Sequence, residues 1–262
     1  MRAAARKLLA DRFPGEVVER LRDTIESGTT REKQSAIDTL AGLKSPAAET
    51  VISAWMERLE QGKCPPELAV EVLDAAGKSP DKSLVERQKK YAAKLAEPGL
   101  TSQYSICVEG GDARRGKKVF EDNDAVSCRR CHSAKPGEVL VGPNLASVGG
   151  LLKRSEILES IVTPNAKICE GFETAVLQLD SGKVVIGIIR RETKDKIELV
   201  DAEAKTIEVD TASVEERVKG KSAMSDGLAE RMTQREIRDL VAYLSELKAP
   251  VEKESAGAAE GK

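Results

Sequence analysis

Cys128-Arg129-Arg130-Cys131-His132 is the most informative stretch of the 262-residue sequence, because it ends on the only histidine of the chain. Two of the five cysteines, Cys128 and Cys131, belong to this motif. A metal site that needs two histidines cannot be built from this chain alone. The spacing instead places two thiols one helical turn apart, with an imidazole directly after them.

A C-x-x-C-H motif is typical of covalent haem attachment. Two thiols one turn apart can each add to a vinyl group of one porphyrin, and the adjacent imidazole can then serve as the proximal iron ligand. One motif and one histidine therefore predict one haem c. In this interpretation Cys128 and Cys131 hold the porphyrin and His132 binds the iron.

Three other interpretations of the motif remain open. A structural zinc site needs two further ligands at paired spacing, whereas Cys64, Cys107 and Cys169 are scattered along the chain. A thioredoxin-like redox pair needs a βαβ context, which the surrounding pattern does not predict. A plain disulfide between the two motif cysteines leaves the histidine without a role.

The composition is that of a folded chain with an almost balanced charge. Apolar residues make up 40% and charged residues 33%, and the formal net charge is −2. These values exclude a collagen-like or wholly disordered chain. The near-neutral charge lacks the bulk positive field of a typical nucleic-acid binder. No apolar run approaches the roughly 18 residues of a transmembrane helix.

Residues 1–100 predict an α-helical domain, organised as repeats or as a plain bundle. Apolar residues recur at helical spacing, and prolines lie between the periodic segments. The expected helices cover 2–13, 15–27, 31–43, 47–61, 66–76 and 81–96. Helical hairpins would start about 35 residues apart, a spacing that loosely resembles HEAT repeats. If they are repeats, we expect them to present a surface to a protein partner.

A second domain is expected over 108–250, after a linker-like segment at 99–111. Asp112 is a candidate N-cap for a helix at 112–121, and another helix is expected at 153–162. Thr233 and Glu236 form a capping-box pattern before a last helix that ends ahead of Pro250. Residues 251–262 form a polar tail that we expect to be disordered.

In residues 172–210 apolar and polar residues alternate, unlike the helical spacing of the preceding segments. Four short antiparallel strands are expected, at 173–179, 183–191, 196–201 and 205–210. Asp180-Ser181-Gly182 supplies a turn between the first two. The predicted fold class is therefore mainly α with a small β insertion.

Residues 108–250 resemble a class I c-type cytochrome. Gly116-x-x-x-Phe120 is similar to the first helix of that family, and Leu240-x-x-Tyr243 to the last helix, which crosses it. Gly142-Pro143-Asn144-Leu145 is similar to the family's proximal loop. The resemblance implies a cytochrome c fold that carries the antiparallel β unit between the haem motif and a methionine-ligand loop. It also implies that the Pro143 carbonyl accepts a hydrogen bond from the His132 Nδ1–H.

The same resemblance implies Met224 as the sixth iron ligand, in a loop ahead of the last helix. Met232 is the reserve candidate and Lys221 a weaker one. Met224 lies 92 residues after His132 (224 − 132 = 92), farther than in most class I proteins, because the strands intervene. Ser225 stands where that family often has proline, which would make the loop softer.

The inserted strands narrow the resemblance to the Pirellula/Verrucomicrobium-type haem-binding domain. The similar stretches are Gly110-Gly111-Asp112, Val141–Leu145, Gly182–Ile188 and Asp239–Leu244. This family implies a periplasmic or otherwise extracytoplasmic setting. The N-terminus does not read as a signal peptide, so for an extracytoplasmic protein we expect the chain to be a mature or excised piece, such as the C-terminal part of a longer protein; the alternative is a cytoplasmic protein. An oxidising setting permits Cys64–Cys107 or Cys107–Cys169 disulfides, with buried thiols as the alternative.

The expected function is single-electron transfer with His/Met axial ligation, serving a linked or partner dehydrogenase or a terminal acceptor. No catalytic residue is expected. Basic residues around the motif would form a rim for an acidic partner, or simply a solvated face: Arg114, Arg115, Lys117, Lys118, Arg129 and Arg130. One alternative is a sensor or catalytic haem with a labile sixth ligand, although the single histidine argues against peroxidase chemistry. Another is a helical interaction protein in which haem is a tether.

Overall fold

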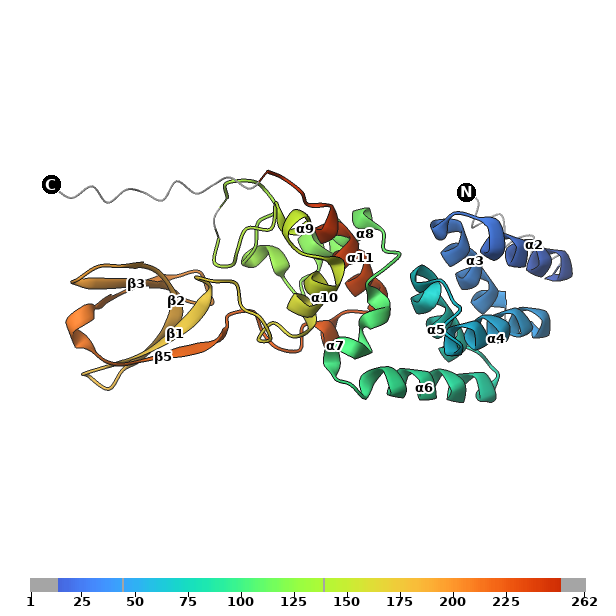
Figure 1. Cartoon of the computed structure of the whole chain (residues 1–262), viewed down its shortest axis with the longest axis horizontal. Coiled ribbons are helices and arrows are strands. Elements are labelled where there is room, and N and C mark those ends of the chain that lie inside the picture. Colours follow the sequence, from blue (N-terminus) through green and yellow to red (C-terminus); the bar gives the residue numbers. More distant parts are fainter. Residues whose placement is uncertain (1–13, 44, 139, 251–262) are drawn as a thin grey trace. The chain divides into compact units, whose positions relative to one another are not determined.

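The computed structural model describes residues 14–43, 45–138 and 140–250 (Figure 1). The chain divides between Gly111 and Asp112 into two compact units. Among the described residues the fold is mainly α-helical with one antiparallel sheet, as the sequence predicts. The predicted helix at 2–13 and the predicted disordered tail at 251–262 lie outside the described residues.

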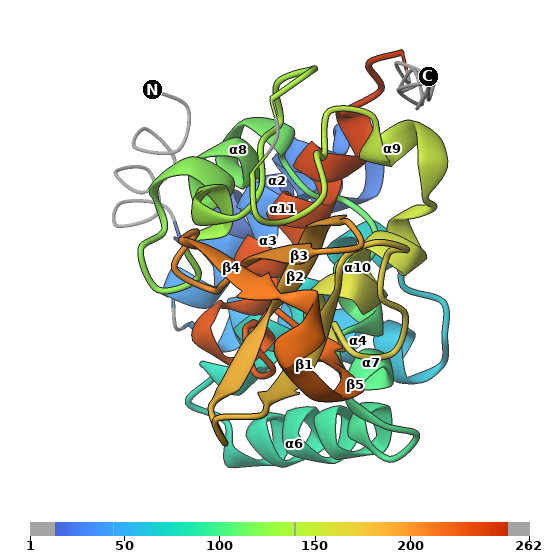
Figure 2. The same ribbon diagram turned by 90° about the vertical axis from the view of Figure 1, so that its left-hand side faces the viewer.

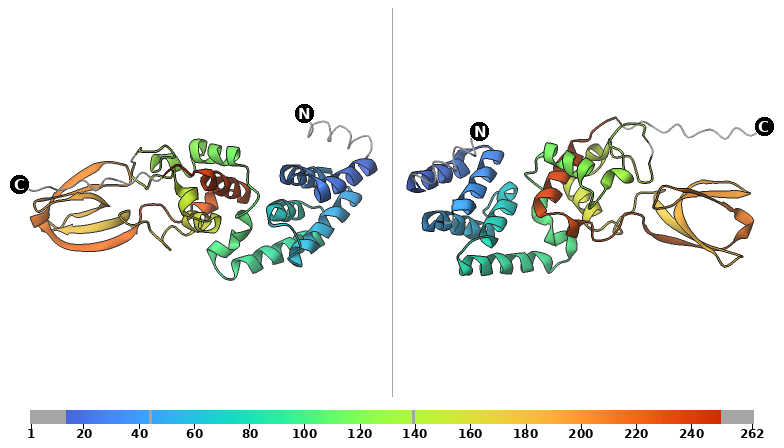
Figure 3. Two further views of the ribbon diagram at one scale, coloured as in Figure 1. Left: turned by 45° about the horizontal axis from the view of Figure 1, so that its top comes forward. Right: turned by 180° about the vertical axis from the view of Figure 1, so that it is seen from behind.

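The first unit is built from helices that match the predicted spans within one to three residues (Figure 3). They are α2 (Pro14–Ser27), α3 (Thr30–Leu43), α4 (Pro46–Glu60), α5 (Ala69–Gly77) and α6 (Lys82–Ala96). Their apolar stripes form one cluster in which Ile25, Leu40 and Met56 are fully buried. The predictions for these five helices are confirmed. The HEAT-like repeat organisation stays a prediction.

The segment expected to be a linker is structured, so that prediction is wrong for residues 100–107. They form α7 (Leu100–Gln103) and the 3₁₀ turn η2 (Ser105–Cys107). Gly99 adopts φ 129° shortly after the end of α6, so the helix does not continue there. Tyr104 and Cys107 are then buried, because short helical turns let a few apolar residues reach the core. The division between the two units falls between Gly111 and Asp112, at the end of the expected linker segment 99–111.

In the second unit α8 (Ala113–Asp122) packs against α11 (Gln234–Glu246). The two backbones approach closely at Gly116, where an added Cβ would lie 1.8 Å from the Asp239 carbonyl oxygen. One turn later Phe120 packs on Tyr243, with ring centroids 5.7 Å apart and planes at 51°. Glycine is thus required at this helix contact because any side chain would collide with backbone.

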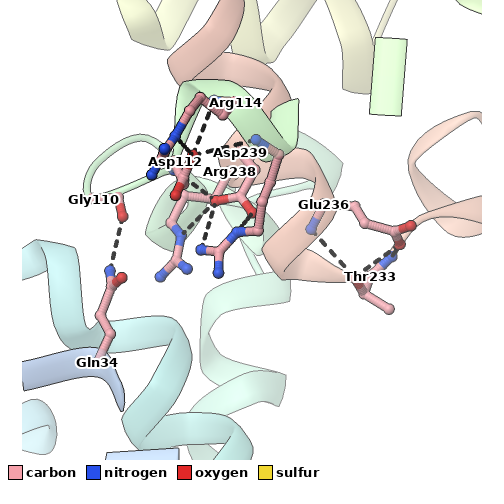
Figure 4. A network of polar contacts seen from close by, with 9 residues as sticks. Gln34, Gly110, Asp112, Arg114, Thr233, Glu236, Arg238 and Asp239 are labelled. Carbon is pink, nitrogen blue, oxygen red and sulfur yellow. Dashed lines mark hydrogen bonds and ion pairs between the residues drawn. The ribbon is translucent and has the colours of Figure 1, made fainter. Parts of the chain in front are cut away.

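A buried carboxylate fixes the start of α8 against α11 (Figure 4). The Asp112 side chain caps α8 by accepting from the amides of Arg114 and Arg115. The Asp112 amide in turn donates to Asp239 Oδ1 at 2.8 Å, and Arg115 Nε donates to Asp239 Oδ2 at 2.7 Å. The predicted N-cap is confirmed, and so is the Thr233–Glu236 capping box, at 3.2 and 2.8 Å.

The sheet has the strand order β4-β3-β2-β1-β5, with every neighbouring pair antiparallel (Figure 2). Its strands are β1 (Glu173–Leu179), β2 (Val184–Glu192), β3 (Lys196–Val200), β4 (Thr206–Asp210) and β5 (Val214–Ser222). One face carries its own apolar cluster, which includes Leu177, Ile197 and Leu199. A sheet with its own core can hold its shape without help from the helices.

The fifth strand is a correction to the predicted four, and it extends the β insertion from 210 to 222. β5 reads Val-Glu-Glu-Arg-Val-Lys-Gly-Lys-Ser and is exposed over most of its length, so it lacks the apolar alternation that marks a strand. It lies at the sheet edge, where charged residues are common. A short helix, α9 (Val148–Leu151), precedes the predicted helix α10 (Arg154–Val162).

Candidate functional site

The C-x-x-C-H motif forms a tight turn that carries both cysteines and the histidine. Cys128–Arg130 is a 3₁₀ turn, η3, and the amides of Cys131 and His132 both donate to the Cys128 carbonyl, at 3.2 and 3.0 Å. Ser127 enters this turn in the left-handed region at φ 47°. A non-glycine residue there is uncommon and concentrates at functional sites. The fold thus holds both thiols and the imidazole on one turn.

His132 is oriented by a backbone carbonyl. Its Nδ1 lies 2.9 Å from the Pro143 carbonyl oxygen. A carbonyl can only accept, so Nδ1 carries the proton and the neutral ring keeps its lone pair on Nε2. This hydrogen bond has the geometry that the family resemblance implies. It fixes the tautomer in which Nε2 is the nitrogen available to a metal.

Gly142 lets the loop that carries Pro143 lie directly against the histidine ring. An added Cβ on Gly142 would lie 2.6 Å from His132 Cε1 and 2.8 Å from its Nδ1. The Gly142 amide also donates to the Cys131 carbonyl at 2.7 Å. The loop and the motif are therefore joined by two hydrogen bonds and one backbone-to-ring contact, which leaves the ring little freedom to rotate.

Burial sets the protonation of the motif. Desolvation lowers the pKa of His132 below its ordinary value, with the Pro143 hydrogen bond acting in the opposite direction. The imidazole is therefore neutral at neutral pH, which is the form that ligates metals. Desolvation raises the pKa of Cys128, and the neighbouring Cys131 raises it further. Cys128 is thus a thiol rather than a thiolate at neutral pH.

Asn144 and Arg190 hold the same loop from its outer side. Asn144 Nδ2 donates to the carbonyls of Lys135 and Glu138, each at 2.7 Å. Arg190, from β2, donates to the carbonyl of Leu140 at 2.7 Å and to that of Val141. The loop behind His132 is thus fastened to the inserted sheet as well as to its own start.

Arg190 reaches the loop because it is the extra residue of a β-bulge. Ile189 pairs with Leu199 and Arg191 with Glu198, so Arg190 has no partner position on β3. Bulges redirect a side chain in this way. The guanidinium also lies 5.1 Å from the ring centroid of Phe172. Sequence reasoning missed Arg190, and the only signal was an arginine at the end of the apolar run 184–189.

Met224 lies two residues beyond the end of β5, in a loop, as expected, and is partly buried. Its amide donates to Ser222 Oγ at 3.2 Å, and Asn165, which hydrogen-bonds to Ser222 and Asp226, lies outside the C-x-x-C-H turn. Met232 is 8% exposed, and the Lys221 side chain is exposed. Asn165 fastens the Met224 loop, and sequence reasoning missed it too.

The basic residues near the motif fall into two groups. Three residues of α8 are engaged with acidic neighbours: Arg115 with Asp239 at 2.7 Å, Lys117 with Glu121 at 3.8 Å and Arg114 with Asp112 at 3.9 Å. Arg129, Arg130 and Lys118 are exposed. The exposed positive charge closest in sequence to the thiols therefore comes from the two arginines inside the motif.

The five cysteines are all described, and no disulfide joins any two of them. Neither the Cys64–Cys107 nor the Cys107–Cys169 bond is formed. Cys64 is partly buried, Cys107 is buried and Cys169 is exposed. Within the described ranges, no three side chains of His, Cys, Asp and Glu converge as a metal-binding group. Across the same ranges no helix is long and apolar enough to cross a membrane.

Comparisons with known proteins add no further identification. No protein-family model matches the chain, and no curated protein is similar enough to count as a match.

Proposed function

We propose that the chain is a monohaem c-type cytochrome that transfers single electrons. Cys128 and Cys131 would hold the porphyrin, His132 and Met224 would bind the iron, and Asp112–Pro250 would form the cytochrome c fold. The observation that carries the proposal is the orientation of the His132 ring, whose Nδ1 donates to the Pro143 carbonyl at 2.9 Å.

The residues present fit a covalently held haem. The two thiols and the imidazole share one turn, and the imidazole keeps a neutral Nε2 lone pair. The backbone at Gly142 occupies the space beside the ring, so Nδ1 is not available to a metal. The crossing of α8 and α11, with Gly116 and the Phe120–Tyr243 pair at the contact, supports the fold part of the proposal.

Haem iron with histidine and methionine ligands supplies reversible one-electron chemistry at a raised potential. The protein's part is to hold the ligands and to limit water. The Pro143 carbonyl increases the electron donation of His132 by accepting its Nδ1 proton in a hydrogen bond. Arg129 and Arg130 offer exposed positive charge to an acidic partner protein, which we propose to be a dehydrogenase or an electron acceptor.

The proposal places the chain outside the cytoplasm, in the periplasm of a bacterial cell, where this type of haem attachment takes place. The helices of the first unit would contact a protein partner. No nucleic-acid role is proposed, because the net charge is only −2.

The direct test is expression together with a c-type haem-maturation system, followed by mass spectrometry under denaturing conditions. We expect the mass to exceed that of the bare chain by one haem. The double variant Cys128→Ala/Cys131→Ala should lose this increment, while Cys64→Ala should keep it. A bare-chain mass for the unmodified protein would refute the proposal.

The axial ligand is tested by optical spectra of the oxidised and reduced protein. We expect a methionine–iron charge-transfer band that is lost in Met224→Ala and kept in Met232→Ala. The opposite pattern would assign Met232. A high-spin spectrum of the unmodified protein would instead indicate a sensor or catalytic haem with an open iron site.

A further inference from the structure

Asn165 joins the two ends of the segment that carries Met224. The Ser222 amide donates to Asn165 Oδ1 at 2.8 Å, and Asn165 Nδ2 donates to Asp226 Oδ1 at 2.7 Å. The partners lie 57 and 61 residues away in sequence. A single amide therefore bridges residues 222 and 226, and Met224 is the middle residue between them.

Asn165 lies in a turn in which the Ala166 amide donates to the Thr163 carbonyl at 2.9 Å. It follows α10 and the buried Pro164, while Ser222 is the last residue of β5. Just before this point β5 has a bulge: Glu173 pairs with Ser222 but Ala175 with Lys219. Gly220 permits the bulge, because an added Cβ would lie 2.1 Å from Thr174 Oγ1. The bulge in β5 therefore lies next to Ser222, whose amide binds Asn165.

An amide side chain suits the chemistry of the bridge. Ser222 N–H can only donate and the Asp226 carboxylate can only accept, so the bridging group needs one acceptor and one donor. Asparagine supplies both from a single planar group. An aspartate at 165 would keep the first bond and place two carboxylates against each other.

The loop has no other strong constraint in its own sequence. Residues 223–225 contain no proline, so their φ angles are not fixed covalently. The Met224 amide donates to Ser222 Oγ at 3.2 Å, a bond within the loop itself. The Asn165 bridge ties both ends of the loop to the turn that follows α10.

We propose that Asn165 is a positioning residue that holds the 222–226 loop in the conformation in which Met224 ligates iron. This inference rests on the proposed function, because it takes Met224 as the sixth ligand. Its effect is on the equilibrium between the bound and released thioether, since a hydrogen bond shifts such an equilibrium by roughly two- to tenfold.

The test is competition for the iron by added imidazole, in the full-length haem-loaded protein. Imidazole replaces a weakly held methionine and abolishes the methionine–iron charge-transfer band. We expect Asn165→Asp to raise the apparent imidazole affinity by about tenfold, because it loses one hydrogen bond and adds like-charge repulsion. The double variant Asn165→Asp/Asp226→Asn should return the affinity to within about twofold of the unmodified protein, since donor and acceptor are then exchanged.

Asp201→Ala is the matched control. Asp201 also fastens a loop of the second unit with two hydrogen bonds, from the amides of Glu203 and Lys205, but in the turn between β3 and β4. We expect it to leave the imidazole affinity unchanged. An equal rise in Asp201→Ala and Asn165→Asp would mean general destabilisation and would overturn the positioning role.

The remaining outcomes separate this inference from the proposed function. If the unmodified protein shows the charge-transfer band and Asn165→Asp behaves like it, the inference fails while the proposed function stands. Failure of the double variant to restore the affinity also overturns the inference. If haem is attached but the unmodified protein has no methionine band, both Met224 ligation and the role of Asn165 are overturned.

Discussion

Gly142 is the residue whose size matters most to the histidine. Gly142→Ala would place a Cβ 2.6 Å from His132 Cε1, so the ring or the loop must move. We expect the variant to lose about 1–3 kcal/mol of stability, as for other overpacked positions. We also expect less covalent haem per chain. Chemical unfolding and the haem-to-protein absorbance ratio measure the two effects.

Gly150→Ala is the control for that substitution. Gly150 is exposed in α9, only eight residues away, and a Cβ there meets nothing within 4 Å. We expect unchanged haem content and equal or slightly higher stability, because alanine is favoured over glycine in helices. Equal losses in both variants would contradict a specific contact with His132.

Cys64 should be the least reactive partly buried thiol. Desolvation raises the pKa of Cys64 to about 12, against an ordinary value of 9.0. A rise of about three units lowers the thiolate fraction roughly a thousandfold, and the thiolate is the species that reacts. With iodoacetamide at pH 8 we expect exposed Cys169 to be alkylated first and Cys64 to stay unmodified, as shown by peptide mapping. Comparable rates at the two cysteines would contradict this.

At the residue scale, the sequence identifies the residues that belong to local motifs. It does not identify residues whose role depends on strand pairing or on partners distant in sequence. The C-x-x-C-H spacing and the Gly142-Pro143 pair are local, so their neighbours can be inferred from order along the chain. Arg190 depends on a bulge between β2 and β3. Asn165 depends on partners about 60 residues away, which no local pattern encodes.

The start of α8 should give the second unit an acid-sensitive point. Desolvation acts to raise the pKa of Asp112, but the backbone hydrogen bonds from Arg115 and Arg114, together with the charges of these two arginines, lower it below its ordinary 3.8. A carboxyl whose folded pKa is lowered adds stability above its unfolded pKa, and this contribution is lost as pH falls below 3.8. We expect the unfolding temperature to drop in that range.

Asp112→Asn isolates this effect, because asparagine is an equally good N-cap. We expect little change at neutral pH and a shallower loss of unfolding temperature below pH 3.8. Asp122→Asn, at the C-terminal end of the same helix, is the matched control, since that carboxylate cannot reach the N-terminal amides. An unaltered acid profile in Asp112→Asn would be evidence against the cap as its source.

At the element scale, amphipathic pattern and caps predicted the long helices well. Strand β5 was not predicted because its own residues are mostly charged. It forms a strand because it pairs with β1. Residues 100–107 escaped because Gly99 and Pro98 indicate a break but do not reveal that Tyr104 and Cys107 are buried after it. Both errors come from elements whose burial is decided by neighbours distant in sequence.

For the whole molecule, the division at Gly111 predicts two pieces that fold separately. The apolar cluster of the first unit uses residues from 17 to 106, and the sheet has its own cluster. We expect 1–111 and 112–262, expressed apart, each to unfold cooperatively. Their far-UV circular dichroism spectra should add up to that of the intact chain.

Haem attachment should stay with the second piece. We expect 112–262 to carry one covalent haem per chain and 1–111 to carry none, by mass spectrometry. A 112–262 fragment that is soluble only when co-expressed with 1–111 would show that the two units depend on each other.

The pairing of Glu173 with Ser222 means that the inserted sheet begins and ends at neighbouring points. Opposed residues of antiparallel strands lie about 5 Å apart, so everything between them is a closed excursion from the rest of the unit. The strands between Glu173 and Ser222 therefore add length along the chain but little distance between the two ends of the insertion. Such an excursion can grow, shrink or be exchanged for a two-residue hairpin turn without moving the points at which it is attached, which makes the sheet a replaceable module.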